Sequence, residues 1–260
     1  MRIALVCHHD NPLNREALPR FLAAEGELAG IVVIRETGDR MWKRLRFEAK
    51  RSGIRMFDVL AFRLFYRLRL SASDRKWVAR RVCAIHAQYP PVLDVPVHET
   101  ADANDEATRA FLQQVRPDLT IARCKTLLRR EVFEVPPLGT YVLHPGVCPE
   151  YRNAHGCFWA LARRDLNRVG ATLLRIDNGV DTGPVYAYYT ADIDESLESH
   201  VVIQYRVVFD NLSAIARDLR RIAAGQAVPL DVSGRESAAW GQPRLTDYLR
   251  WKRSARRGAS

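Results

Sequence analysis

The chain has 260 residues, 47% of them hydrophobic, and a formal net charge of +10. This length supports one substantial core or two small ones, and no apolar run approaches the roughly 18–20 residues that span a bilayer. Residues 1–6 begin a strand rather than a signal peptide, so we expect a cytoplasmic protein. The five cysteines form no CxxC pair and no zinc-ligand spacing, and we expect no metal site.

The first 34 residues predict a β-α-β unit. Residues 2–6 and 28–34 are short apolar strands, and residues 14–24 have helical spacing with Leu18, Phe21 and Leu22 on one face. Such a unit is the usual opening of a parallel sheet. The turn after the first strand, residues 7–12, contains no GxGxxG and no P-loop, which argues against a dinucleotide or triphosphate cradle there.

A strongly basic segment follows. Between Arg40 and Arg81 there are fourteen Lys or Arg against three Asp or Glu, so this segment carries the whole positive excess. Apolar residues alternate with the arginines at helix-like spacing, at Trp42, Leu45, Phe57, Leu60, Phe62, Leu64, Phe65 and Leu68. Amphipathic helices could pack their apolar face on the sheet and leave the arginines solvated. Alternatively, residues 40–81 could form a basic surface for an anionic partner, a nucleotide-linked substrate or a membrane.

The rest of the chain continues the alternation of strands and helices. We expect strands at 118–122, 139–143, 171–176 and 184–189, and helices at 103–115, 154–163, 201–224 and 245–253. Residues 1–225 then form one α/β domain with a basic helical insertion at 40–85, and residues 226–260 form a C-terminal extension.

Residues capable of chemistry are densest between positions 144 and 183. His144 ends a predicted strand and is followed by Pro-Gly, where open α/β sheets place their sites. The polar loop at 177–183, Asp-Asn-Gly-Val-Asp-Thr-Gly, lacks the ligand pattern and closing Glu of a calcium-binding EF-hand. We therefore take His144 and this loop together as the candidate site.

Residues 90–190 resemble the formyltransferase family, whose members use 10-formyltetrahydrofolate. The resemblance rests on motifs in order along the chain: Pro117-Asp118-Leu119, Leu127-Leu128, Gly139, His144-Pro145-Gly146, Pro149-x-Tyr151-Arg152, Trp159-Ala160-Leu161, Gly170-Ala171-Thr172 and Asp177-x-Gly179-Val180-Asp181-Thr182-Gly183. It implies a Rossmann-like formyltransferase fold with a mainly parallel central sheet, in agreement with the strand and helix pattern.

The resemblance also implies a catalytic pair, His144 and Asp181. Moving a formyl group from N10 of the folate to an amine passes through a tetrahedral intermediate that carries an oxyanion. An Asp beside an imidazole favours the imidazolium, which stabilises that charge, and the same Asp can position a water that carries the proton.

One position departs from the family. In the family, the residue two positions before the catalytic His is an Asn that donates a hydrogen bond to the formyl oxygen. This chain has Val142 at that position. Another donor, with Lys125 and Asn153 as candidates, could replace it. The protein could instead hydrolyse formyl-folate, or bind folate without catalysis. Retention of both His144 and Asp181 favours an active transferase.

Two loops match those that hold the folate in the family, largely through main-chain groups. They contribute the expected cofactor-binding residues Cys124, Lys125, Thr126, Leu127, Leu128, Asp177, Asn178, Gly179 and Val180. The resemblance further places Tyr151, Arg152, Asn153 and His155 on the acceptor side as substrate-binding residues, although His155 is also suited to a helix start.

The acceptor follows by elimination within the family. Residues after the core are too few for the C-terminal barrel of methionyl-tRNA formyltransferases, and the purine-synthesis enzyme lacks the basic insertion. The resemblance therefore favours a nucleotide-linked amino sugar or another small amine. The tail around Trp240-Gly241-Gln242-Pro243 could cover the acceptor pocket or mediate a homodimer. A polyanion- or membrane-surface-binding protein acting through residues 40–81 is the alternative from another class.

Overall fold

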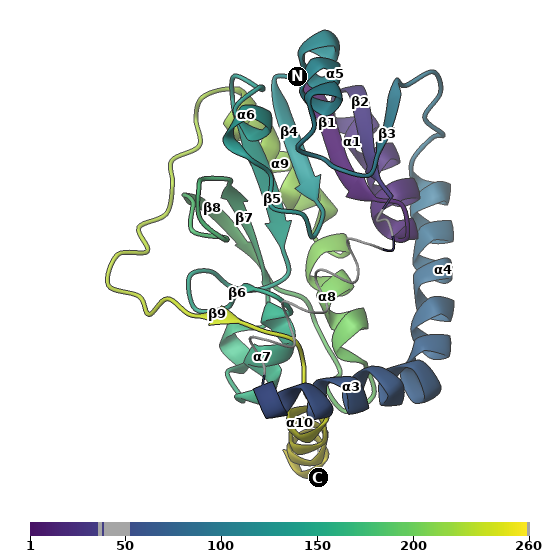
Figure 1. Cartoon of the computed structure of the whole chain (residues 1–260), viewed down its shortest axis with the longest axis vertical. Coiled ribbons are helices and arrows are strands. Elements are labelled where there is room, and N and C mark those ends of the chain that lie inside the picture. Colours follow the sequence, from purple (N-terminus) through teal and green to yellow (C-terminus); the bar gives the residue numbers. More distant parts are fainter. Residues whose placement is uncertain (36–37, 39–52, 259–260) are drawn as a thin grey trace.

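The computed structural model describes residues 1–35, 38 and 53–258, and a seven-stranded sheet runs through its centre (Figure 1). The strand order is β3-β2-β1-β4-β5-β7-β8. The strands are β1 (Arg2–His8), β2 (Glu27–Ile34), β3 (Val97–Thr100), β4 (Leu119–Arg123), β5 (Thr140–His144), β7 (Ala171–Arg175) and β8 (Val185–Tyr189).

The first five strands are parallel, and β7 and β8 are antiparallel to their neighbours. This mainly parallel α/β sheet confirms the fold class predicted from the sequence. β1 pairs with β2 on one side and with β4 on the other, so the chain changes direction across the sheet beside β1. Such a switch point opens a crevice at the carboxyl ends of the strands.

Helices cover both faces of the sheet. The described α-helices are α1 (Leu18–Glu25), α3 (Met56–Phe65), α4 (Ser71–Gln88), α5 (Glu106–Val115), α6 (Arg130–Phe133), α7 (Gly156–Ala162), α8 (His200–Phe209), α9 (Leu212–Ala223) and α10 (Leu245–Gly258). Alternate residues of a strand face opposite sides. Accordingly, Ile3 and Leu5 join a core with α1, α7, α8, α9 and α10, whereas Ala4 and Val6 join a second core with α5 and α6.

The C-terminal segment packs into the main core. Trp251 of α10 is completely buried and lies edge-on to Phe158 of α7. Upstream, β9 (Ala239–Trp240) pairs with β6 (Arg152–Asn153) in a separate two-stranded sheet. The C-terminal segment therefore contacts the α/β body at two places, through β9 and through α10.

The helix predicted over 201–224 is wrong as a single element. The structure has α8 and α9, separated at Asp210 and Asn211. The Asn211 side chain donates from Nδ2 to the carbonyl oxygens of Val207 and Thr190, at 3.1 and 2.7 Å. Side-chain bonding of this kind competes with the helical ladder, and it lets α9 leave the direction of α8. The short strands β3, β6 and β9 are not foreseen by periodicity.

The described part of the basic segment is helical, as expected, but some of its apolar side chains are buried and others are exposed. Val59 and Phe62 of α3 are buried in the main body. Five others form what we call the α3 stripe, which is exposed to solvent: Ile54, Phe57, Leu60, Leu64 and Leu68. The expectation that Phe57, Leu60, Leu64 and Leu68 pack on the sheet is therefore wrong, because that side of the helix faces away from it. Trp42 and Leu45 lie outside the described residues.

Bilayer-spanning helices are not found among the described residues, since none is both long and apolar enough.

Candidate functional site

A cavity of about 1230 Å³ opens where β1, β4 and β5 end. Most of the predicted site residues line it together: Cys124, Lys125, Thr126, Leu127, Leu128, His144, Asn153, His155, Asp177, Asn178, Gly179, Val180 and Asp181. Ligand sites usually have volumes of roughly 300–1,000 Å³. This cavity therefore has room for more than one small molecule.

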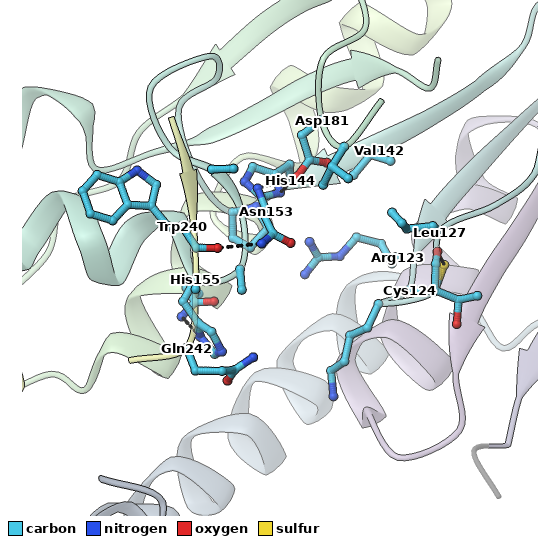
Figure 2. Close-up of a pocket in the computed structure, with 18 of the residues that line it drawn as sticks. Arg123, Cys124, Leu127, Val142, His144, Asn153, His155, Asp181, Trp240 and Gln242 are labelled. Carbon is cyan, nitrogen blue, oxygen red and sulfur yellow. Dashed lines mark hydrogen bonds and ion pairs between the residues drawn. The ribbon is translucent and has the colours of Figure 1, made fainter. Parts of the chain in front are cut away.

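His144 and Asp181 lie side by side at the base of this cavity (Figure 2). His144 is the last residue of β5 and is buried, and its Nδ1 lies 3.4 Å from Oδ2 of Asp181. On the other side of the ring, Nε2 lies 2.9 Å from the carbonyl oxygen of Tyr151. Both ring nitrogens therefore face oxygen atoms of the protein.

This arrangement constrains the protons on His144. A carbonyl oxygen can only accept, so Nε2 must carry a proton to bond Tyr151. A neutral ring would then turn the lone pair of Nδ1 toward the Asp181 carboxylate, which is repulsive. An imidazolium satisfies both partners, because Nδ1 then donates to Asp181. With both ring nitrogens protonated, His144 would therefore donate one hydrogen bond to Tyr151 and one to Asp181.

The segment 151–153 holds both members of the pair. Besides the Tyr151 carbonyl, the backbone N–H of Asn153 donates to Oδ2 of Asp181 at 2.8 Å, and Arg152 Nη1 donates to the carbonyl of Val180 at 2.8 Å. Tyr151 and Arg152 do not line the cavity; the Tyr151 hydroxyl donates to Asp165, and its ring stacks on Trp240. Two of the residues expected to bind substrate therefore lie outside the cavity lining and contact His144 and the loop that contains Asp181.

The loop at 177–183 has a shape that its sequence explains. Asp177 Oδ1 accepts from the backbone N–H of Gly179 at 2.9 Å and from the Thr182 hydroxyl at 2.7 Å. A side chain at position 179 would clash, because its Cβ would fall 1.9 Å from Thr182 Oγ1. Asp181 itself has a left-handed backbone with φ of 52°.

Asn153 and His155 are also left-handed, at φ of 72° and 58°. Asn, Asp and His are the residues other than Gly that adopt this conformation most readily. Such backbone strain tends to gather at functional sites.

The loop at 124–128 forms the opposite wall. The backbone N–H of Lys125 donates to Nε2 of His8 at 3.0 Å, which ties the loop to the end of β1. Leu127 is 65% exposed although it lines the cavity, so a flat apolar ligand could cover it. Burial raises the pKa of the Cys124 thiol to about 11, so that thiol is neutral at pH 7.

His155 lies across the cavity from Cys124 and is uncharged at neutral pH. Burial, followed by the charges of Lys125 and Arg63, lowers its pKa to about 4. Gln204 of α8 lies 3.3 Å from its Nδ1, and Gln242 forms a further side-chain hydrogen bond with it. His155 can therefore offer hydrogen bonds to a ligand but not a positive charge.

Arg123, Trp240 and Gln242 are among the lining residues that are absent from the site predicted from the sequence. Arg123 is the last residue of β4, and its charge at the end of a buried strand is a signal that the sequence does contain. The tail containing Trp240 and Gln242 was expected either to cover the pocket or to form a dimer contact. The structure places both residues along the cavity wall (Figure 2).

Comparison with protein families gives one match that covers more than half of the chain. A family model described as "Formyl transferase" matches residues 70–218. Among curated proteins, a methionyl-tRNA formyltransferase of Thermus thermophilus is 32% identical over 108 residues, which is 41% of this chain and 35% of that protein. The chain thus aligns with only about a third of that relative's length.

Solved structures agree with the fold. A phosphoribosylglycinamide formyltransferase from Anaplasma phagocytophilum superposes with a TM-score of 0.57 at 12% identity, covering 94% of this chain and 99% of the other. A sugar N-formyltransferase from Shewanella sp. FDAARGOS_354 gives a TM-score of 0.55 at 11% identity, covering 96% and 86%. Identities this low speak for the fold alone.

Proposed function

Because this chain belongs to the formyl transferase family, we propose that it is an enzyme that moves a formyl group from 10-formyltetrahydrofolate to the amine of a small acceptor. The observation that carries the proposal is the pairing of His144 with Asp181 at 3.4 Å inside the cavity. An acid–base pair placed inside a cavity is what transfer between two nitrogen atoms requires.

The walls of the cavity suit a folate donor. The loops at 124–128 and 177–180 line the same space, together with the apolar side chains of Val142, Leu174 and Ile176. Main-chain groups of the two loops would hold the pterin ring, and the exposed Leu127 would pack on it. The donor supplies the activated formyl group.

His144 and Asp181 would divide the chemistry. Asp181 uses Oδ2 for His144 and Asn153, and its Oδ1 has no hydrogen-bond partner among the described residues. Oδ1 is thus placed to accept the proton from the attacking amine and to return it to the departing nitrogen. The imidazolium of His144 would contribute positive charge beside the reacting carbon.

The acceptor we propose is a nucleotide-linked amino sugar. Positive side chains, among them Arg55, Lys125 and Arg244, line the cavity together with Asp10, Asp177 and Asp181. Arg and Lys are the usual ligands of a pyrophosphate. The fold is also shared with a solved sugar N-formyltransferase.

The test is release of tetrahydrofolate from 10-formyltetrahydrofolate with and without a panel of nucleotide-linked amino sugars. Release that needs an acceptor supports the transferase. Release without an acceptor replaces it by a formyl-folate hydrolase. Donor binding without any release overturns the enzyme and leaves a folate-binding homologue, and no binding at all overturns the donor as well.

A different observation supports a second role, attachment to an anionic membrane surface. The α3 stripe is exposed along a helix in a region, residues 53–88, with eight Arg or Lys against two Asp. An apolar helix face flanked by arginines is the pattern of a helix that lies in the lipid interface. Each cation near an anionic surface adds about 1 kcal/mol.

We expect the protein to sediment with vesicles of phosphatidylcholine and phosphatidylserine, but not with phosphatidylcholine alone. The triple variant Phe57→Ser, Leu64→Ser, Leu68→Ser should bind at least about tenfold more weakly, because each lost side chain removes on the order of 1.5–3 kcal/mol of burial. Leu93→Ser, at an exposed leucine elsewhere, is the control and should bind normally. If the triple variant instead converts a dimer into a monomer, the stripe is a dimer interface and the lipid assignment is wrong.

A further inference from the structure

Arg123 has an unusual position for a charged residue. It ends β4, one residue after Ala122, which pairs with Val142 of β5, and it lines the cavity together with His144. Nη1 donates to the carbonyl oxygen of Leu143, and Nε donates to Oδ1 of Asn14 at 3.3 Å. Figure 2 shows the guanidinium pointing away from the loop at 124–128, toward the side of the cavity where Asn153 and His144 lie.

The charge of this guanidinium is not compensated within the described chain. Among the described residues, no carboxylate forms an ion pair with Arg123, and its Nη2 has no hydrogen-bond partner. Burial lowers the pKa of Arg123. Because arginine stays protonated in proteins, the cavity contains a fixed cation. A partly buried cation without a counter-charge is costly unless a ligand supplies the negative charge.

Formyl transfer creates such a charge next to His144. As the amine nitrogen bonds to the formyl carbon, the electrons of the C=O bond move to oxygen; they return when the bond to N10 breaks. This oxygen needs a hydrogen-bond donor. Both nitrogens of His144 already face Tyr151 and Asp181, and Val142 has no donor.

We propose that Arg123 is a catalytic residue that binds the formyl oxygen through Nη2 and stabilises the negative charge that develops on it. The assignment rests on the proposed function, since it needs a formyl group in this cavity. It differs from Lys125 and Asn153, the two donors considered from the sequence. Lys125 is 65% exposed, and Asn153 directs its side-chain N–H to the carbonyl of Trp240 at 2.6 Å.

The test uses two stable folate analogues and needs neither turnover nor an acceptor. Calorimetry would give the Kd of 10-formyl-5,8-dideazafolate and of 5,8-dideazafolate, which lacks the formyl group. A hydrogen bond from a charged donor predicts about tenfold or tighter binding of the formylated analogue by the wild-type protein. In Arg123→Met this preference should vanish, while the Kd of the unformylated analogue changes by less than about threefold.

Two further variants complete the design. Arg123→Lys retains the buried charge, but its shorter side chain does not reach the place of Nη2, so the preference should fall there too. Arg20→Met is the matched control, because Arg20 also donates to main-chain carbonyls, those of His86 and Tyr89, and does not line the cavity.

The possible failures are distinguishable. If neither analogue binds the wild-type protein, the proposed donor is wrong. If both analogues bind and the preference for the formyl group is absent from the wild type, or persists in Arg123→Met and Arg123→Lys, the assignment of Arg123 alone is overturned.

Discussion

Asp181→Asn lowers acceptor-dependent turnover by about 10²- to 10⁴-fold, the usual contribution of a positioned acid–base group. Asparagine has the same shape as aspartate and tolerates the left-handed backbone at φ of 52°, so the loop should keep its structure. The amide cannot accept the proton of the attacking amine, and it carries no negative charge beside His144. Steady-state kinetics should show the loss in kcat more than in KM.

Asp94→Asn is the matched control for this substitution. Asp94 also has a left-handed backbone, at φ of 56°, but it is exposed and lies outside the cavity, so turnover should stay within about twofold of wild type. His144→Gln should cost a similar factor to Asp181→Asn, and the double variant little more, because the two residues act as a unit. Wild-type kcat in Asp181→Asn would contradict the role of the pair.

Trp251→Ala is expected to lower the free energy of unfolding by about 3–5 kcal/mol, as large aromatic truncations in a core do. Trp251 is 0% exposed, and its ring packs against Tyr248 and Phe158. Its Nε1 also donates to Oε2 of Glu195 at 3.0 Å, so the alanine variant deprives that carboxylate of a donor. Urea unfolding measures the change.

Leu249→Ala, on the same helix, provides the comparison. Leu249 is partly exposed, so its truncation should cost less than about 1 kcal/mol. Equal, small losses in both variants would mean that residues 226–260 are an appendage. A large loss at Trp251 alone would mean that the extension folds as part of the α/β domain.

Periodicity in the sequence was sufficient to predict every strand of the seven-stranded sheet except the edge strand β3. The apolar runs of β1, β2, β4 and β5 are buried on both faces, and such strands leave a clear signal. The two helices at 200–223 were not separable in this way. The break between them depends on Asn211 reaching Thr190, a contact between positions far apart in the chain.

The candidate site was located by motif, but the directions of its side chains were not. Tyr151 and Arg152 belong to the motif, yet they contact His144 and the loop at 177–183 and do not line the cavity. Arg123 lines the cavity because the parallel register sets Ala122, the residue before it, opposite Val142, which brings the end of β4 next to the end of β5. Register of this kind is a property of pairing and cannot be read from one strand.

The residues that line the cavity are held by two different sheets. His144, Arg123 and the loops that follow their strands belong to the seven-stranded sheet, whereas residues 239–242 reach the cavity through the two-residue pairing of β6 with β9. Exchanging residues 239–242 between related chains would reshape one wall and break no hydrogen bond of the larger sheet. Residues 239–242 are therefore a place where natural divergence or laboratory engineering can change which ligand the cavity accepts. His144 and Asp181, on the other side of the cavity, would keep their positions.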